Sequence, residues 1–343
     1  MQSNEKLNPK SSPIATPEQF IYYNRFIIIK YLLYAMNSKN INKSKAPIFV
    51  LCMSRSGSTL TRYILDTHPK IACPPELHIG SLLSKLQWVY LHTAKLNHHQ
   101  DTKQIQTYLQ HKLQQNISGI MGDFLKQSRK KIWCDKSVFT IDHLDIIKFV
   151  YPSARYICLY RNAYDQIASS QETFSHIPTN DTEDPYGFAE YINKAKDSVN
   201  GLADYWLAKV NTIYNFQKDN PEQSISIKYE DIVNDSDATV KRLFSFLQLS
   251  YPEGLLDDVF KVQRPPGAGD HKIHSTNKIQ SNSVGRASRY TTIGLTAERA
   301  AKIESMHSDL GYQLDQAIPA DTKIRERKSN SATQDEASEL AMA

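Results

Sequence analysis

The 343-residue chain has only four cysteines, and it has no apolar run long enough to cross a bilayer. A transmembrane helix needs about 20 apolar residues, whereas the apolar stretch 26–36 is short and is interrupted by Lys30. We expect a packed helix there, with a membrane-surface helix as the alternative. The polar N-terminus also lacks a signal-peptide core. These absences predict a cytoplasmic protein with reduced, buried thiols and no membrane span.

Signatures of metal sites and of nucleic-acid binding are missing as well. No two cysteines have the C-x-x-C spacing, and no histidine grouping has Cys, Asp or Glu at ligand spacing. The net charge of +5 is modest, and no basic cluster alternates with aromatic residues. We therefore expect no metal and no nucleic-acid partner, although the charge is compatible with anionic ligands.

The most informative segment present is PIFVLCMSRSGSTL, residues 47–60. Its apolar run predicts a buried strand, and the pattern that begins at Leu60 predicts a helix. A strand that leads through a small turn into a helix N-terminus forms an anion site, because the first N–H groups of the helix have no partner within it. Ser58 and Thr59 add hydroxyl donors and Arg55 adds a charge, which favours a phosphate ligand. A strand–turn–helix corner without a ligand is the alternative.

This segment departs from the Walker A loop of nucleoside triphosphatases. That motif places Lys directly before its hydroxyl residue, whereas here Gly57 precedes Ser58 and the cation is Arg55. A second predicted core strand, 154–160, ends at Arg161 instead of at a magnesium-holding acid. An arginine at the carboxyl end of a strand faces the crevice where α/β sheets bind ligands. Ser169 lies about two helical turns further on and could reach the same phosphate. A surface Arg and a Ser without a role are the alternative.

Strands alternate with helices along the chain, which predicts an α/β fold of the P-loop type. We expect three layers, with a central, mostly parallel sheet flanked by helices. The predicted strands are 48–53, 132–135, 154–160 and 224–229, and the predicted helices are 18–37, 141–149, 162–172, 186–218, 237–247 and 296–310.

One domain is expected to span residues 18–315, between a disordered N-terminus at 1–17 and a disordered tail at 316–343. Within this domain, residues at about 81–131 are predicted to form a helical insertion. Residues at about 263–292 are rich in Gly, Ser, Pro and basic residues, which predicts a long loop that contacts cofactor or substrate.

Several motifs resemble those of the PAPS-dependent sulfotransferase superfamily and follow one another along the chain in the same order as in that family. The resemblance covers about residues 47–310. SRSGST resembles the loop that binds the 5′-phosphosulfate, the segment from Arg161 to Ser169 resembles the 3′-phosphate motif, and Tyr229-Glu-Asp-Ile resembles the adenine-binding tyrosine segment. The chain is most similar to the tyrosylprotein sulfotransferases. That likeness lies in residues 54–76 and in Trp133-Cys-Asp-Lys, and also in Ser283-Val-Gly-Arg-Ala-Ser-Arg-Tyr.

The resemblance implies roles for individual residues. Those it assigns to cofactor binding are Arg55, Ser56, Gly57, Ser58, Thr59, Leu60, Arg161, Ser169, Tyr229 and Ser288. Those it assigns to catalysis are Glu76 as the general base, with Lys136, Arg55 and Ser288 at the leaving group. His78 and His68 are weaker rivals for the role of base.

These roles predict that a sulfonate group moves in line from PAPS to a hydroxyl of an alcohol, a phenol or a peptide tyrosine. The product is 3′-phosphoadenosine 5′-phosphate, and arginine and lysine supply the charge that magnesium supplies in phosphoryl transfer. A P-loop small-molecule kinase and a non-catalytic nucleotide-binding protein are the alternatives. The kinase would need a lysine in the loop and a magnesium-holding acid, and both are missing at the expected places.

Some features leave the acceptor and the assembly open. His78 stands where the tyrosine-sulfating enzymes have a substrate-contacting arginine, so the acceptor can be a small molecule or a peptide. Cys73 and Cys134 match positions that form a disulfide in those enzymes, and in a reducing cytosol they are expected to be close but unpaired. A homodimer also remains an open alternative.

Overall fold

The computed structural model describes residues 46–93, 102–173, 187–264, 273, 276–289 and 294–312, without the side chains of 288 and 289. The predictions for residues 1–17, 18–37 and 316–343 lie outside these ranges, as does a large part of the loop at 263–292. Within the described ranges, no helix combines the length and apolar character that a membrane span requires.

Five parallel strands form the central sheet in the order β2-β3-β1-β4-β5. The strands β1 and β4 are neighbours, with Leu51 opposite Cys158. The chain builds β2 and β3 on one side of β1 and then crosses to build β4 and β5 on the other side. The strands are β1 (Ile48–Leu51), β2 (Ile71–Ala72), β3 (Ile132–Asp135), β4 (Arg155–Tyr160) and β5 (Ser224–Lys228).

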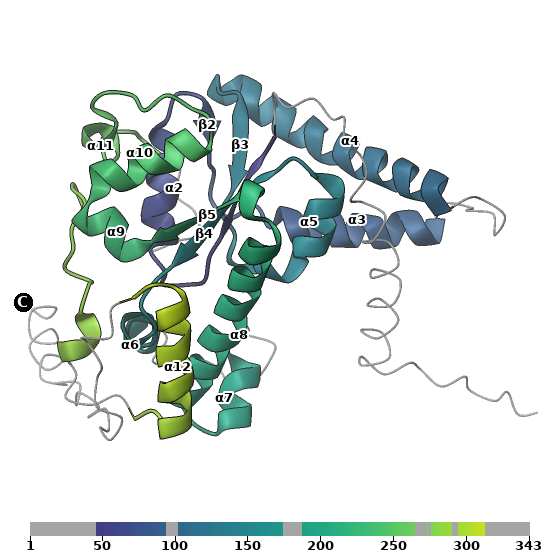
Figure 1. The fold of residues 1–343 in the computed structure, drawn as a ribbon. Helices are drawn as coiled ribbons and strands as arrows, with labels where there is room; N and C mark the ends of the chain where they lie inside the picture. Colours follow the sequence, from purple (N-terminus) through teal and green to yellow (C-terminus); the bar gives the residue numbers. More distant parts are fainter. Residues whose placement is uncertain are drawn as a thin grey trace, which may run out of the picture.

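Both faces of the sheet are covered by helices, which confirms the predicted three layers (Figure 1). The helices on one face are α2 (Ser58–Thr67), α9 (Tyr229–Asn234), α10 (Ser236–Phe246) and α11 (Leu255–Asp258). Those on the other face are α3 (Ile79–Thr93), α4 (Thr102–Ser128), α5 (Leu144–Val150), α6 (Ala163–Thr173), α7 (Ala189–Ala195), α8 (Ser198–Asp219) and α12 (Ala297–Asp309). Short 3₁₀ helices are η3 (Val138–His143), η5 (Pro221–Gln223) and η7 (Arg286–Arg289).

The strand β1 shows why the fold has two cores. Successive side chains of a strand point to opposite faces of the sheet. Phe49 and Leu51 therefore join the core beneath α3, α5 and α8, whereas Ile48 and Val50 join the core beneath α2 and α10. A strand buried on both faces must be apolar throughout, which is the pattern that the sequence presents there.

The predicted strands are confirmed, as are most of the predicted helices that fall in the described residues, with shifts of one to three residues. The predicted long helix 186–218 is wrong in its interior, where Lys196 takes a left-handed conformation (φ 55°) and ends α7. Asp197 then starts α8 by accepting a hydrogen bond from the Asn200 N–H. The short elements β2, α9 and α11 were not predicted because none of them is long enough to show a hydrophobic period.

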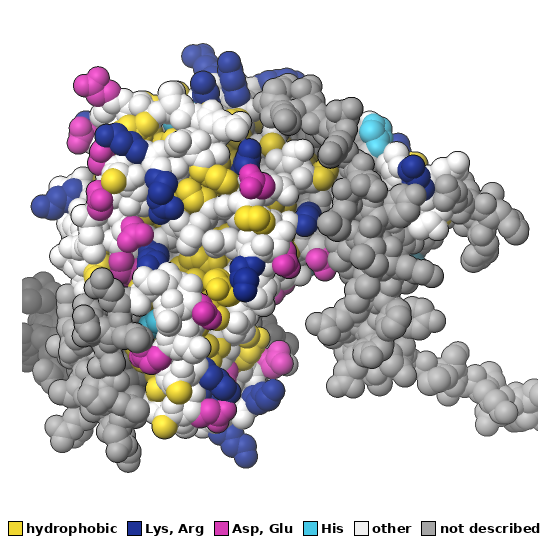
Figure 2. Space-filling model, in the orientation of Figure 1, with side chains coloured by type: hydrophobic (Ala, Val, Ile, Leu, Met, Phe, Trp, Pro, Cys, Tyr) yellow, Lys and Arg dark blue, Asp and Glu magenta, His cyan; other side chains and the backbone are white. Residues whose placement is uncertain are grey.

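Charged side chains of both signs lie on the surface, as the modest net charge of +5 suggests (Figure 2). Over most of the face shown in Figure 2, Lys and Arg side chains are interspersed with Asp and Glu side chains, apart from a group of basic side chains along the upper edge. Among the described residues, no group of three or more His, Cys, Asp or Glu side chains could hold a metal ion.

Candidate functional site

The site lies at the carboxyl edge of the sheet. There the connection that follows β1 and the connection that follows β4 run to opposite sides. The loop 52–57 follows β1, Lys136 follows β3 and Arg161 follows β4. In open parallel sheets this point, where the strand order reverses, is the usual ligand crevice. The topology therefore brings three segments that are far apart in sequence to one edge.

The loop after β1 has a constrained backbone. Arg55 and Gly57 both adopt left-handed conformations, with φ of 62° and 86°. The Ser56 hydroxyl donates a hydrogen bond of 2.7 Å to the Met53 carbonyl. A Cβ atom at Gly57 would lie only 2.2 Å from Cδ2 of Tyr229. Only glycine satisfies both the backbone angle and this close approach.

Gly57 precedes α2 without a side-chain cap. Ser58 and Thr59 occupy the first turn of that helix, and each is only 7% exposed. The helix thus presents its N-terminal end, which carries a partial positive charge, to the crevice. Leu60, which was also predicted to bind the cofactor, follows in the same turn.

Arg161 is the centre of the second half of the site. Its guanidinium donates 2.6 Å and 2.8 Å hydrogen bonds to the carbonyls of Arg55 and Ser283. The same group lies 4.7 Å from the centroid of the Tyr229 ring, and burial lowers its pKa from the usual value. Its buried Nε atom has no hydrogen-bond partner among the described residues. A buried donor without a partner is costly, which favours an acceptor that arrives with a ligand.

Arg55 joins the two halves. Its Nε atom donates a 3.1 Å hydrogen bond to Oγ of Ser169, on the second turn of α6. The structure therefore brings together Arg55, Gly57, Arg161, Ser169 and Tyr229, all of which were predicted to bind the cofactor. Ser288 lies in η7, which follows Ser283 closely, but its side chain is outside the described residues.

Glu76 and Lys136 form an ion pair beside this cradle. Their Oε1 and Nζ atoms are 2.7 Å apart, and the side chains are 10% and 1% exposed. An ion pair so far from water is stable only when both partners are present, because either charge alone would be buried without compensation. The two predicted catalytic groups thus share one location.

The segment that carries Glu76 is fixed to the end of β3. The N–H of Ile79 donates to Oδ2 of Asp135 at 3.1 Å, and the N–H of His78 donates to Oγ of Ser137 at 2.9 Å. Asp135 is fully buried, which raises the pKa of its carboxyl group. These hydrogen bonds hold Glu76 against the residue that follows β3, which is Lys136.

Geometry separates the two histidines that were rivals for the role of base. His68 follows the last residue of α2, at the end of that helix opposite the cradle, and its Nε2 atom is 3.0 Å from the Ser250 carbonyl. His78 is two residues from Glu76, has a φ of 53° and packs its ring against Phe139. Of the two, only His78 belongs to the segment that carries Glu76.

All four cysteines are free and buried. Burial raises the pKa of Cys52 to about 12, so this thiol is neutral near pH 7 and does not serve as a nucleophile. Burial, together with a side-chain hydrogen bond to Cys73, raises the pKa of Cys134 well above its usual value. The prediction that these two thiols are close is confirmed, and both are unpaired here.

Sequence reasoning missed several residues that support the site. Glu230 accepts hydrogen bonds from the Asn162 N–H (2.9 Å) and the Tyr312 hydroxyl (3.0 Å), which ties the residue after Tyr229 to the residue after Arg161. Asp165 accepts hydrogen bonds from two N–H groups of the segment that contains Ser283. Both acids lie inside the recognised motifs, but no sequence signal indicates what they hold.

His307 supports the start of α6 and should make stability depend on pH. Its ring packs against Tyr164 and Trp206, and its Nε2 atom accepts the Ala163 N–H at 3.0 Å. Burial lowers its pKa to about 4, whereas in the unfolded chain it titrates near 6.5. The unfolded state therefore binds more protons between these values. Its contribution is complete above about pH 6.5 and is lost as the pH falls towards 4, by on the order of 3 kcal/mol.

Urea unfolding of wild type and His307→Gln at pH 7.5 and 4.5 measures this effect. Gln retains an acceptor but does not titrate, so we expect the variant to lose less stability than wild type on acidification. The exposed His92→Gln should behave like wild type. Equal losses in wild type and His307→Gln would contradict the assignment.

Comparison with known proteins identifies the family. The sulfotransferase family model matches residues 47–253, which contain the loop, the ion pair and Arg161. The chain belongs to the sulfotransferase family. Among curated relatives, it is 22% identical to protein-tyrosine sulfotransferase 1 of Danio rerio over 281 residues, which is 79% of this chain and 73% of that protein.

Solved sulfotransferase structures share the fold. A sulfotransferase domain from the curacin biosynthetic pathway has a TM-score of 0.52 and 21% identity, and the match covers 78% of this chain and 98% of that domain. The sulfotransferase domain of the Synechococcus PCC 7002 olefin synthase has a TM-score of 0.53 and 22% identity, with coverage of 81% and 98%. The recognised superfamily and the α/β fold are thus both confirmed, and membership of this family supports sulfotransfer.

Proposed function

We propose that this sulfotransferase-family protein transfers a sulfonate group from PAPS to an acceptor hydroxyl, with Glu76 as the general base. The observation that carries the proposal is the convergence of Arg55, Arg161 and Ser169 around one cradle, with the Glu76–Lys136 ion pair beside it. Two arginines and a helix N-terminus suit a ligand with two separate anionic groups better than one with a single phosphate.

The residues of the cradle fit such a nucleotide. Among the described residues the buried Nε atom of Arg161 has no partner, and the missing side chain of Gly57 lets the Tyr229 ring lie directly against the loop. Ser58 and Thr59 would hold the 5′-phosphate with Arg55, while Arg161 and Ser169 would hold the 3′-phosphate. The Tyr229 ring, beside Arg161, would bind the adenine. When bound, PAPS supplies the sulfonate group.

The chemistry of the protein side depends on charge and position. The Glu76 carboxylate would take the proton of the acceptor hydroxyl as its oxygen becomes a nucleophile. The Lys136 ammonium, 2.7 Å from that carboxylate, and the Arg55 guanidinium would offset negative charge that develops during transfer. Because both partners of the ion pair are almost fully buried, water is largely kept from them.

The acceptor is proposed to be an alcohol, a phenol or a peptide tyrosine. The name of the Danio rerio relative supports a tyrosine hydroxyl. His78, two residues after Glu76 with its ring against Phe139, would contact the acceptor.

Transfer of label from [³⁵S]PAPS into libraries of alcohols, phenols and tyrosine peptides tests the function. We expect labelled product, insensitive to EDTA, and tighter binding of 3′-phosphoadenosine 5′-phosphate than of ATP in calorimetry. Tighter binding of ATP, or activity that EDTA removes and magnesium restores, would instead support a kinase. Nucleotide binding without any transfer would support a non-catalytic protein.

Replacing Arg161 should remove recognition of the 3′-phosphate. We expect Arg161→Ala to weaken binding of 3′-phosphoadenosine 5′-phosphate by about 2 kcal/mol or more, roughly thirtyfold, because a charge-assisted contact is lost. Preference over adenosine 5′-phosphate should collapse as well. Arg155→Ala is the matched control, since Arg155 is the first residue of β4 and lies at the end of that strand opposite Arg161. A variant that still prefers the 3′-phosphorylated nucleotide would show that another residue reads this group.

A further inference from the structure

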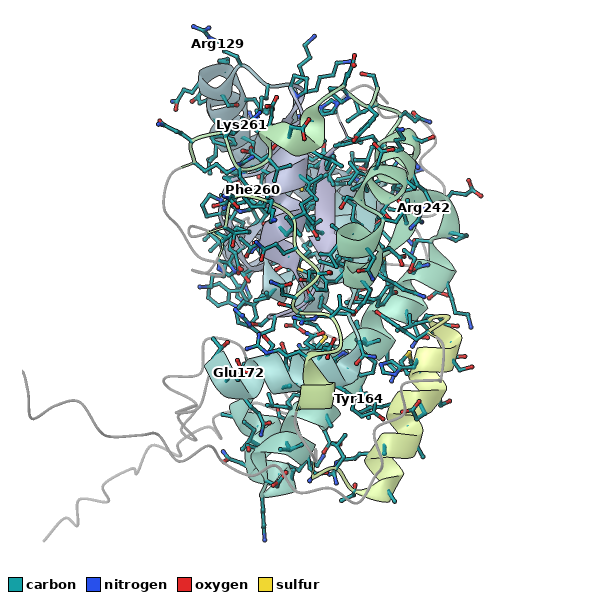
Figure 3. All side chains as sticks on the ribbon, turned by 90° about the vertical axis from the view of Figure 1, so that its left-hand side faces the viewer. Arg129, Tyr164, Glu172, Arg242, Phe260 and Lys261 are labelled. Atoms are coloured by element: carbon teal, nitrogen blue, oxygen red, sulfur yellow. The ribbon has the colours of Figure 1, made fainter. Side chains whose placement is uncertain are left out.

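A short segment of the late loop is bound to α6 through the backbone. We call residues 283–287 the strap. The Asp165 carboxylate accepts hydrogen bonds from the N–H groups of Gly285 (2.8 Å) and Ala287 (2.7 Å), one on each oxygen. In Figure 3 the short helix η7, which begins at the end of the strap, lies beside α6 between the labelled Tyr164 and Glu172.

Asp165 is well placed to hold the strap. It lies in the first turn of α6, where its negative charge is favourable. The N–H groups that need a cap there, those of Tyr164 and Asp165 itself, already donate to Oδ1 of Asn162. Asp165 is 3% exposed, and the free-energy cost of burying its charge is offset mainly by the hydrogen bonds that its carboxylate accepts. In the described residues both side-chain oxygens have such a bond from the strap.

The strap also contacts the proposed nucleotide site directly. The Ser283 carbonyl accepts the 2.8 Å hydrogen bond from Arg161, the residue proposed to hold the 3′-phosphate. At the other end, Arg286 pairs with Glu172, near the end of α6. The strap thus crosses from Arg161 along α6, and the N–H groups of Gly285 and Ala287 are fixed by one carboxylate.

We propose that Asp165 is a positioning residue that holds the strap against α6, and that the strap retains the nucleotide at Arg161; the second part rests on the proposed function. No direct contact between Asp165 and a substrate is required. Releasing the strap frees Ser283 from its position beside Arg161 and opens the path by which a nucleotide leaves. The effect therefore falls on nucleotide affinity and release, more than on the reacting groups at Glu76 and Lys136.

Asp165→Asn tests the proposal with little change of shape. An amide has one acceptor oxygen, so its NH₂ group would face one of the two strap N–H groups, which are donors. We expect trypsin to cleave after Arg286 in the nucleotide-free protein about tenfold faster than in wild type, because local opening becomes easier. We expect 3′-phosphoadenosine 5′-phosphate to dissociate faster by a similar, roughly tenfold factor. The KM for PAPS should rise with a smaller change in kcat.

Two further variants keep the test decisive. Gly285→Ala loosens the strap from its own side, because Gly285 has a φ of 66°, which disfavours a side chain; it should shift cleavage in the same direction even if Asp165→Asn folds poorly. Asp204→Asn is the control, since its carboxylate pairs with Arg299 on α12, away from the strap. Its cleavage after Arg286 should equal that of wild type.

The outcomes separate this proposal from the proposed function. Wild-type cleavage rates in both Asp165→Asn and Gly285→Ala would overturn the role of Asp165. Faster cleavage with unchanged nucleotide dissociation would overturn the retaining role of the strap. If wild type does not bind the bisphosphate at all, the proposed function and the retaining role fail, while the cleavage rates of the free protein still decide whether Asp165 holds the strap.

Discussion

Glu76→Gln is expected to lower kcat by about 10² to 10⁴, the usual contribution of a general base. Gln has nearly the same shape, and its side-chain oxygen can still accept the hydrogen bond from Lys136 that the structure shows at 2.7 Å. What it lacks is the ability to take a proton from the acceptor hydroxyl. Glu76 is not one of the residues proposed to bind the nucleotide. Binding of 3′-phosphoadenosine 5′-phosphate should therefore change little.

Steady-state kinetics and calorimetry on the same preparation separate the two effects. A Glu76→Gln variant that keeps most of its turnover would transfer the role to His78, the rival in the same segment of the chain. A variant that no longer binds the bisphosphate would show that Glu76 is structural. Lys136→Met provides a comparison, because it leaves the carboxylate buried beside a neutral side chain and should therefore also destabilise the fold.

Gly57→Ala should weaken nucleotide binding by about a hundredfold or more. The added Cβ would lie 2.2 Å from Tyr229, so the ring or the loop must move. The backbone angle of 86° also penalises any side chain by about 1 kcal/mol, and crowding in a packed region adds roughly 1–3 kcal/mol. Displacement of the ring disturbs the proposed adenine site and phosphate loop together.

Gly119→Ala is the matched control for this substitution. Gly119 lies within α4, and a Cβ there meets nothing within 4 Å. Alanine should therefore stabilise the helix by about 0.5–1 kcal/mol and leave nucleotide binding unchanged. Calorimetric titration and thermal unfolding measure both quantities. Normal nucleotide affinity in Gly57→Ala would show that the contact with Tyr229 is unimportant for binding.

The sequence predicted the elements whose residues carry a repeated pattern or a recognisable motif. The strand from Ile48 and the strand that ends at Tyr160 are apolar, and each is followed directly by a recognisable motif. Both the parallel sheet and the edge at which ligands bind could therefore be predicted. The resemblance of the loop and of the Arg161 segment then indicated a family that the comparisons confirm.

Other features depend on tertiary contacts that no local pattern encodes. Glu76 follows two prolines in a segment without periodicity, and its distance from Lys136 depends on hydrogen bonds to Asp135 and Ser137. His307 lies 144 residues along the chain from Ala163, whose N–H it accepts at the start of α6. The break between α7 and α8 depends on a single left-handed lysine, a conformation that is uncommon for that residue type.

Arg161 has a consequence for attempts to change the sulfonate donor. Its guanidinium holds the Arg55 carbonyl, so it stiffens the loop after β1 in addition to its proposed role in holding the 3′-phosphate. A redesign for a donor without the 3′-phosphate cannot simply delete this side chain, because the loop would lose its brace at the same time. Such a design would have to keep a planar, double donor at position 161 and instead fill the space near Ser169 with a larger side chain.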